Sequence, residues 1–285
     1  MICAAPLYGN IVADVKVALA RDQVPQAIEI VRSYRASGGV TPEVVEALSW
    51  IARAEFIRKD VVKADQYAQE SYKLAQSQLK THPLAQSANL QTAFGAAIEV
   101  EANVMAMRGE RTAAITYLRD QLKMFYATPL RTRIQKNLNL LSLEGKPAPA
   151  LEHALIAKGK PALLFFWAHW CGDCKYEAAI LARIRNEYSP KGLQFIAQTE
   201  KFGYIGNGDD APPEVELRYI EQVRQQYYSG VVDAPALVSE ENINKYGAST
   251  TPTLVLVDRA GIVRMYHPGA MSYEELRPRV DALFR

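Results

Sequence analysis

The chain has 285 residues, of which 49% are hydrophobic and 22% are charged. A soluble globular protein has this composition, and the length allows two domains of ordinary size. The net charge of +2 at pH 7 gives no reason to expect nucleic acid as a partner. We also expect no membrane span, because no run of about 18 apolar residues occurs.

The first residues, Met1 to Pro6, lack the basic segment and the long apolar stretch of a secretory signal peptide. We therefore expect either a cytoplasmic protein or one whose leader was removed before this numbering begins. Cys3 lies in this terminal segment, and we expect it to have no role. Three cysteines, only two of them paired by spacing, do not indicate a disulfide-rich secreted scaffold.

Residues 10–143 show helical periodicity and are rich in the residues that favour helices. Three hexamers in this half are similar to one another, at residues 22–27, 59–64 and 109–114. Each combines a tight turn with a small residue on the next helix, where a neighbouring helix packs closely. This half resembles a degenerate tetratricopeptide array of about three helical hairpins, a type of stack that often binds a protein partner. The alternative is an irregular helical bundle that only supports or dimerises the second half.

The segment Gly145–Ala150 is dense in Pro and Gly and cannot continue a helix, so it predicts domains over 10–143 and 144–285. Beyond it, we expect strands at 162–167, 193–198, 253–258 and 262–267, and helices at 172–188, 214–228 and 272–284. Strands separated by helices predict a parallel sheet with helices on both faces. The Arg259-Ala260-Gly261 turn predicts a hairpin between the last two strands, which makes the sheet mixed. The fold class is therefore an all-α helical-repeat domain followed by an α/β domain.

Two cysteines that are two residues apart, Cys171 and Cys174, directly follow the strand predicted at 162–167. Cys171 then lies where a helix begins, and there the free backbone N–H groups and the helix dipole favour a thiolate. A thiolate attacks disulfides, and Cys174 lies one helical turn on, close enough to resolve the mixed disulfide. This spacing is a known sign of thiol redox chemistry. Half of a zinc site would have the same spacing, but no second Cys pair or suitably spaced His pair accompanies it, so we expect no metal.

Residues 145–285 resemble the thioredoxin superfamily, in particular the TlpA- and ResA-like disulfide reductases. The resemblance lies in residues 145–149 with 158–161, in residues 166–174, and in residues 246–261. It implies an α/β thioredoxin-like domain with a mixed sheet. It also implies a cis Thr251–Pro252 peptide bond that faces the cysteine pair, so that Thr251 and Pro252 hold an extended substrate. Trp170 would cover the disulfide from one side.

Several positions depart from thioredoxin itself, which has a buried Asp where this chain has Phe165. In TlpA- and ResA-like proteins a Glu just beyond the next strand lies near the disulfide, and Glu200 stands at that position here. The alternative is that Glu200 is a solvated loop carboxylate. Asp173 stands where reductases often have Pro, and its carboxylate disfavours a nearby thiolate. We therefore expect a reducing rather than an oxidising cysteine pair.

Residues 201–245 form a longer insert than a minimal thioredoxin needs. We expect a plain surface excursion, and the alternative is that the insert shapes substrate choice. His169, next to the cysteine pair, either tunes it electrostatically or has no role.

The predicted function is that of an enzyme, a thiol–disulfide oxidoreductase that reduces protein disulfides. Cys171 attacks, Cys174 resolves, and an upstream thiol supplies electrons; no cofactor beyond this disulfide is expected. A peroxiredoxin-like peroxidase would need a Thr-x-x-Cys segment and a supporting Arg, which we do not find. The other alternative is a partner-binding helical-repeat scaffold with a vestigial redox domain, against which the intact cysteine pair and Pro252 count. TlpA- and ResA-like proteins are usually exported, so we expect the cell envelope or periplasm if a leader was removed, and the cytoplasm otherwise.

Overall fold

The computed structural model describes residues 10–206 and 208–285, so Cys3 and the Met1–Pro6 segment lie outside the described residues. The contacts within the chain define two units, one that ends at Ile134 and one that spans Gln135–Arg285. Among the described residues, no helix combines the length and the hydrophobicity that crossing a membrane requires.

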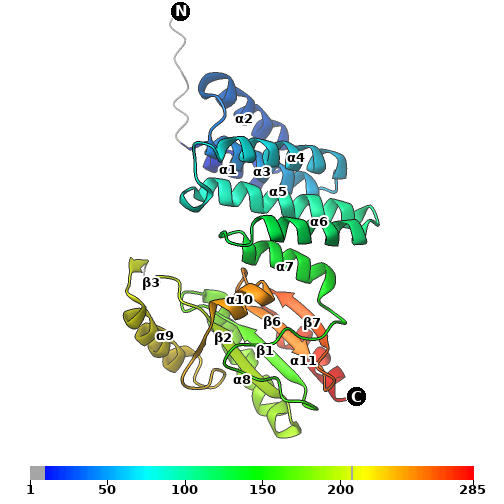
Figure 1. The fold of residues 1–285 in the computed structure, drawn as a ribbon, viewed down its shortest axis with the longest axis vertical. Coiled ribbons are helices and arrows are strands. Elements are labelled where there is room, and N and C mark those ends of the chain that lie inside the picture. The colour runs from blue at the N-terminus through cyan, green and yellow to red at the C-terminus, as the bar shows by residue number, and fades with distance from the viewer. Residues whose placement is uncertain (1–9, 207) are drawn as a thin grey trace, which may run out of the picture. The chain divides into compact units, whose positions relative to one another are not determined.

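The described part of the first unit is helical. Its helices are α1 (Ile11–Ala20), α2 (Val24–Gly38), α3 (Pro42–Ile57), α4 (Val61–Gln78), α5 (Ala88–Met107), α6 (Arg111–Met124) and the first residues of α7 (Arg131–Ser142), with a 3-10 turn at Leu84–Gln86. The helices pair in sequence, α1 with α2, α3 with α4 and α5 with α6 (Figure 1). The side chains of Thr41, Asp60 and Ser87 accept a backbone N–H at the starts of α3, α4 and α5. This unit confirms a helical region in the first half of the chain.

The three similar hexamers occupy equivalent turns in the three helix pairs. The first residue of each has a positive φ, 58° at Asp22, 64° at Lys59 and 84° at Gly109. In every turn the next residue donates its backbone N–H to a carbonyl near the end of the preceding helix. The small residue of each hexamer is fully buried: Ala27, Ala64 and Ala114. The internal similarity therefore corresponds to three hairpins with one turn geometry, while the assignment to tetratricopeptide repeats stays a prediction.

The second unit is an α/β domain around one five-stranded sheet. Its elements are β1 (Ala162–Phe166), α8 (Gly172–Tyr188), β2 (Gln194–Thr199), β3 (Tyr204–Ile205), β4 (Asp209–Asp210), α9 (Pro213–Tyr227), β5 (Leu237–Val238), α10 (Glu240–Tyr246), β6 (Thr253–Val257), β7 (Val263–Pro268) and α11 (Tyr273–Asp281). The strand order is β5-β2-β1-β6-β7. β1 runs parallel to β2 and antiparallel to β6, and β6 and β7 form the expected hairpin. The predicted mixed sheet is confirmed, and β3, β4, β5 and α10 are additions that we did not predict.

The central strand, β1, is buried on both faces, which explains its unbroken apolar sequence. Leu163 and Phe165 contribute to one buried cluster, which also contains side chains of α8, α9 and α11. Leu164 and Phe166 point to the opposite cluster, which includes Tyr246 of α10. Helices thus cover both faces of the sheet, and the carboxyl end of β1 leads directly into the cysteine pair.

The division between the units falls inside α7, earlier than the boundary predicted at residues 143–144. The second half of α7 packs on the α/β unit, where Asn139 Nδ2 donates to the carbonyl of Tyr246 at 2.9 Å. The Pro- and Gly-rich segment that suggested the boundary instead runs along the edge of β7. There the Gly145 N–H donates to the Val263 carbonyl at 2.8 Å. The Pro- and Gly-rich segment therefore ends the helical sequence, but the division between the two packed units lies earlier in the chain.

Candidate active site

Cys171 and Cys174 form a disulfide, with their Cα atoms 5.3 Å apart. Cys171 is the N-cap residue of α8, and its Sγ accepts the backbone N–H of Cys174 at 3.0 Å. Cys171 is 3% exposed and Cys174 is fully buried. The same N–H and the positive end of the helix dipole would stabilise a thiolate at Cys171. The geometry therefore favours Cys171 as the attacking sulfur and Cys174 as the resolving one.

Thr251 and Pro252 lie at the same end of the sheet as the disulfide. The peptide bond between them is cis. Thr253, the first residue of β6, pairs with Phe166, the last residue of β1, so the segments that continue beyond this pair share one sheet end. The Thr251 hydroxyl is buried and has no hydrogen-bond partner among the described residues. The two predicted substrate-holding residues are thus near the end of β1 that carries the cysteines.

Trp170 and Asp173 lie one residue before and two residues after the attacking cysteine in the chain, and both are exposed. Trp170 is 47% exposed, and its ring meets the ring of Phe202 edge-on at a centroid distance of 5.6 Å. Asp173 is exposed in the first turn of α8. An exposed aromatic side chain therefore precedes Cys171 in the chain, and an exposed carboxylate follows it by two residues.

Phe165 stands where thioredoxin has a buried Asp, and its ring is fully buried and packs against Tyr228, so no side chain at this position can take a proton from Cys174. Glu200 follows β2, and burial raises its pKa to about 7; the carboxylates of Glu240 and Glu216 act in the same direction. The charges that act on Glu200 thus come from α10 and α9. Its predicted place near the disulfide stays a prediction.

A second acid, Glu177, was not singled out from the sequence. Its side chain is fully buried, and its Oε2 accepts the backbone N–H of Met271 at 2.9 Å, while Oε1 has no partner among the described residues. Burial raises the pKa of Glu177 to about 7; the charges of Asp173 and Glu275 add to this effect, and the Met271 N–H opposes it. Glu177 follows Cys174 by three residues on α8, which places the two on one helix face. The three-residue spacing between Cys174 and Glu177 in the predicted helix was the sequence signal that could have identified Glu177.

The insert at residues 201–245 is not the plain surface excursion that we expected. Ile220 and Val223 of α9, and Tyr228 directly after it, lie in the buried cluster that contains both cysteines. The Tyr228 ring packs on Trp167 at a centroid distance of 4.6 Å. The insert therefore packs against the residues that precede Cys171.

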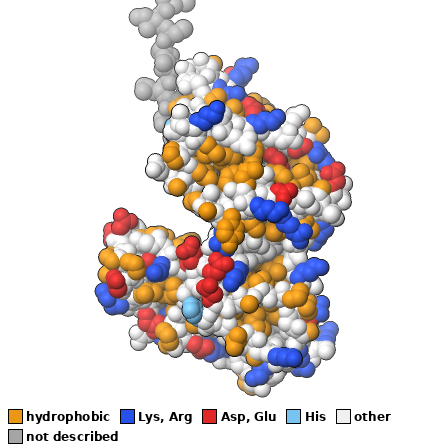
Figure 2. Space-filling model, viewed as in Figure 1, with side chains coloured by type: hydrophobic (Ala, Val, Ile, Leu, Met, Phe, Trp, Pro, Cys, Tyr) orange, Lys and Arg blue, Asp and Glu red, His pale blue; other side chains and the backbone are white. Residues whose placement is uncertain are grey.

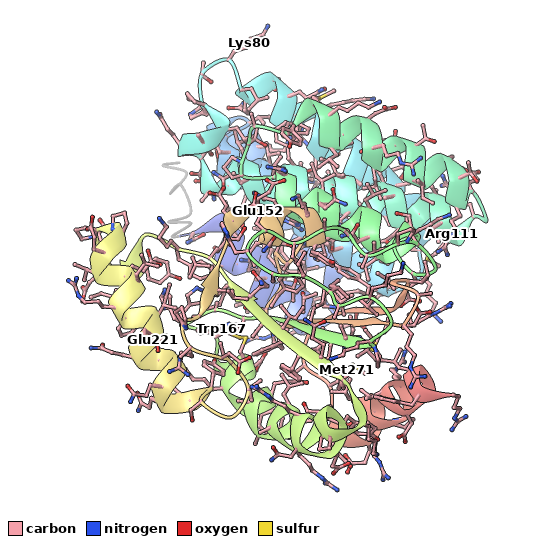
Figure 3. The ribbon with its side chains drawn as sticks, turned by 60° about the horizontal axis from the view of Figure 1, so that its bottom comes forward. Lys80, Arg111, Glu152, Trp167, Glu221 and Met271 are labelled. Atoms are coloured by element: carbon pink, nitrogen blue, oxygen red, sulfur yellow. A yellow bond between two sulfur atoms is a disulfide. The ribbon has the colours of Figure 1, made fainter. Side chains whose placement is uncertain are left out.

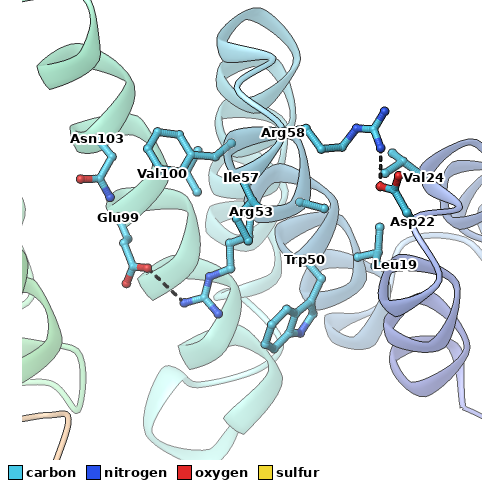
Figure 4. A pocket seen from close by; sticks show the side chains of 12 residues that line it. Leu19, Asp22, Val24, Trp50, Arg53, Ile57, Arg58, Glu99, Val100 and Asn103 are labelled. Carbon is cyan, nitrogen blue, oxygen red and sulfur yellow. Dashed lines mark hydrogen bonds and ion pairs between the residues drawn. The ribbon is translucent and has the colours of Figure 1, made fainter. Parts of the chain in front are cut away.

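The helical unit has its own hollow, of about 510 Å³, between α1, α3 and α5. Figure 4 shows Trp50, Ile57 and Val100 on its wall, with an ion pair between Arg53 and Glu99. Ile57 is 79% exposed there. This hollow is the candidate surface for the protein partner predicted on the helical half.

No group of three or more His, Cys, Asp or Glu side chains in residues 10–206 and 208–285 could hold a metal ion. On the face drawn in Figure 2, basic and acidic side chains are interspersed with hydrophobic ones rather than gathered into one basic surface.

Comparisons with known proteins concern the second half of the chain. The family model described as "Thioredoxin-like domain" matches residues 150–284. "Thioredoxin-like protein YneN" of Bacillus subtilis (strain 168) is 27% identical over 125 residues, which are 44% of this chain and 66% of the relative. "Thiol:disulfide interchange protein DsbE" of Xylella fastidiosa (strain Temecula1) is 26% identical over 150 residues, with 49% and 68% coverage. "Thiol-disulfide oxidoreductase ResA" of Geobacillus thermodenitrificans is 24% identical over 145 residues, with 50% and 72% coverage.

These matches cover about two thirds of the relatives' own length. Among solved structures, StoA from Bacillus subtilis is 19% identical and aligns with a TM-score of 0.34, covering 44% of this chain and 84% of that one. A DsbF structure titled "MTB dsbF in its mixed oxidized and reduced forms" is 23% identical, with a TM-score of 0.34 and coverage of 44% and 82%. The predicted thioredoxin-like domain is confirmed by the family model: residues 150–284 of this chain match a thioredoxin-like domain, and the relatives to which this half is similar include proteins named DsbE and ResA.

Proposed function

We propose that this chain is a thiol–disulfide oxidoreductase that reduces disulfides in proteins. The observation that carries the proposal is the Cys171–Cys174 disulfide at the start of α8, with the Cys171 sulfur bonded to a backbone N–H. The relatives named as disulfide interchange proteins and oxidoreductases support the same activity.

In the reduced enzyme, the Cys171 thiolate attacks one sulfur of the substrate disulfide. A bond forms between Cys171 and that sulfur, and the other substrate sulfur leaves as a thiolate, which takes up a proton. Cys174, as a thiolate, then attacks Cys171, releases the second substrate thiolate and restores the Cys171–Cys174 disulfide. Two electrons pass from the dithiol to the substrate, and an upstream thiol donor must return them.

The Cys174 thiol has to lose a proton before it can attack. Glu177 is the acceptor that we propose, because it is buried on the same face of α8 and has a free oxygen. Its pKa of about 7 suits the exchange of a proton near neutral pH. The proton returns to solvent or substrate when the cycle closes.

Thr251 and Pro252 hold the extended substrate beside Cys171, and Trp170 covers the disulfide. Asp173 weakens the thiolate and moves the pair toward a reducing potential. Glu200 is a further carboxylate at the same end of the sheet. Their placement at one sheet end supports these roles.

The test is reduction of insulin by the full chain with a dithiol as electron donor. Cys171→Ser should lose insulin reduction, because a serine hydroxyl cannot form the mixed disulfide, and Cys174→Ser should accumulate the mixed disulfide with substrate. Cys3→Ser is the matched control and should keep the wild-type rate. Full activity in Cys171→Ser would exclude the proposed chemistry, and peroxide consumption without insulin reduction would favour a peroxidase.

The cell envelope is the compartment that we propose, on the resemblance to TlpA- and ResA-like proteins. Fractionation of cells that produce the native gene product, with its leader if one exists, tests this. Recovery only from the cytoplasm would contradict it.

A partner-binding role for the helical half is a second candidate, and the hollow with the exposed Ile57 favours it. If the chain were only a scaffold, a partner would still be retained when both active-site cysteines are Ser, and the wild type would reduce no disulfide. Reduction of insulin by the wild type would exclude the alternative in which the chain is only a scaffold.

A further inference from the structure

A groove with a volume of about 530 Å³ lies between the turn that joins β6 to β7 and the end of α11. Among the described residues, the apolar part of its lining consists of Leu256, Ala260, Ala282 and Leu283. The charged part is mostly basic and contains Arg259, Arg264, Arg279 and Arg285. A groove of this size fits a small organic ligand, and the arginines favour an anion.

The lining contains one acid in the described part of the chain, Asp258, and its carboxylate is already bonded. Its Oδ2 accepts Nε–H of Arg264 at 2.6 Å. Its Oδ1 accepts the backbone N–H groups of Ala260 and Ile262 at 2.8 and 2.9 Å, which holds the turn. Asp258 therefore balances the charge of Arg264 and leaves the other arginines of the groove unbalanced.

The remaining three arginines form no ion pair with a carboxylate of the described residues: Arg259, Arg279 and Arg285. All three are exposed. Glu275, one helical turn before Arg279, is instead bonded to the backbone N–H and the hydroxyl of Ser272, at 2.9 and 2.8 Å. Like charges that line one groove repel one another, and an anionic ligand would remove that repulsion.

The chemistry of the lining favours a phosphate monoester over a single carboxylate. A phosphate monoester carries about two negative charges at neutral pH and has three terminal oxygens. Guanidinium groups bind such oxygens through pairs of N–H bonds. The apolar residues of the lining, Leu256 and Leu283 among them, can contact an organic group attached to the phosphate.

The groove and the disulfide lie at opposite ends of the sheet. β6 is antiparallel to β1, and Val257, the last residue of β6, pairs with Ala162, the first residue of β1. The cysteine pair follows the other end of β1. Figure 3 labels Trp167, which directly follows β1, and shows α11, drawn in red, well apart from it. A ligand in the groove therefore does not cover the cysteine pair.

We propose that Arg259, Arg279 and Arg285 bind the phosphate of a phosphate monoester whose organic group lies beside the apolar lining of the groove. Two sources present this chemistry, a free organic phosphate and the headgroup of phosphatidic acid in a membrane. The site is separate from the cysteine pair, so the inference goes beyond the proposed reductase activity and does not depend on it.

Isothermal titration calorimetry of the full chain with hexyl phosphate tests the free ligand. We expect saturable binding, and weaker binding of inorganic phosphate, which has no apolar group. Combining Arg259→Gln with Arg279→Gln should raise the Kd for hexyl phosphate at least about tenfold, because two charge-assisted contacts are lost. Arg218→Gln removes the same charge from an exposed position on α9 and is the matched control, which should bind as the wild type does.

Co-sedimentation with phosphatidylcholine vesicles, with and without phosphatidic acid, tests the lipid source. Retention of the wild type only by vesicles that contain phosphatidic acid, with loss in the double variant, would assign the lipid headgroup. Binding of hexyl phosphate without binding of these vesicles would assign a free organic phosphate. Binding of neither probe would overturn the inference, and so would equal binding by the double variant, since the anion would then lie elsewhere.

Two further measurements separate this site from folding and from catalysis. Neither Arg259 nor Arg279 has an ion-pair partner among the described residues, so the unfolding free energy of the double variant should not fall. A loss of binding then reports the site rather than the fold. Insulin reduction by the double variant should equal that of the wild type. Absence of insulin reduction in the wild type would contradict the proposed function alone, because phosphate binding is measured without it.

Discussion

Replacing Glu177 by Gln should make the oxidised protein more stable, relative to the wild type, at high pH than at low pH. The wild-type carboxyl is fully buried and has one backbone donor, the Met271 N–H at 2.9 Å. A Gln side chain has the same size, and its carbonyl oxygen can accept the same N–H. The substitution therefore removes the ionisation and keeps the side-chain size and the Met271 hydrogen bond, while the amide NH2 takes the place of Oε1, which has no partner among the described residues, at a cost that does not depend on pH.

The magnitude follows from the pKa, which burial raises from 4.5 to about 7. Below about pH 4.5 the carboxyl is protonated in both the folded and the unfolded chain, so it contributes no pH dependence. Between about pH 4.5 and pH 7 the carboxyl keeps its proton in the folded chain and loses it in the unfolded chain, so the free energy of unfolding falls as the pH rises. Above about pH 7 the folded state holds a buried carboxylate at a cost of about 3 kcal/mol.

Urea unfolding of the oxidised wild type and of Glu177→Gln at pH 4.5 and pH 8.5 measures the effect. The difference in unfolding free energy between variant and wild type should increase by about 3 kcal/mol from the lower to the higher pH. Glu274→Gln, an exposed change on α11, is the control and should show a difference near zero at both values. The pH profile of insulin reduction should also lose its step near pH 7 in Glu177→Gln.

A difference that stays constant with pH would refute the reasoning, because it would mean that Glu177 ionises in the folded protein as easily as in the unfolded chain. The two proposed roles of Glu177, as a buried ionisable group and as the acceptor of the Cys174 proton, can be separated. They separate if the difference in unfolding free energy depends on pH while the pH profile of insulin reduction does not change. In that case Glu177 would be buried as described but would not carry the Cys174 proton.

Three further changes test the packing. Gly247 has a φ of 61°, and an added Cβ would lie 2.3 Å from the backbone N of Lys136. Gly247→Ala should therefore cost at least about 2 kcal/mol more than Gly261→Ala, whose φ is 79° but whose Cβ would meet open space, and equal losses would contradict the clash. Tyr228→Phe removes a buried hydroxyl that has no partner among the described residues, so it should raise the unfolding free energy by about 1 kcal/mol; a clear loss would indicate a missing partner. Phe94→Ala in the fully buried core of the helical unit should cost about 3 to 5 kcal/mol in thermal or urea unfolding, and a loss below about 1 kcal/mol would mean that the site is loosely packed.

Local sequence was sufficient for the elements with strong periodicity. The apolar run of β1 and the helix that follows it are read from consecutive residues, so the position of Cys171 at their junction was predictable. The short elements β5 and α10 were missed, because two to seven residues carry too little periodic signal to stand out from a loop. The helical turns at Asp22 and Lys59 could be matched to each other because their similarity is also local.

The acids of the candidate site show what the sequence could not predict. Glu177, Glu200 and Glu216 are indistinguishable in type, and what separates them is burial and the donors that long-range folding brings to them. Met271 reaches Glu177 from beyond β7, and Glu216 reaches His169 from a helix that the sequence suggested was only a surface excursion.

The sequence by itself therefore predicted the fold class, the position of the cysteine pair at the start of a helix and the resemblance to thioredoxin-like domains, because these depend on periodicity and on residues at fixed short spacing. Only the tertiary structure decided which carboxylate is buried behind Cys174, and that the insert packs against Trp170. Both depend on contacts between residues far apart in the chain, and the free energies of burial and hydrogen bonding that they establish leave no local pattern in the sequence.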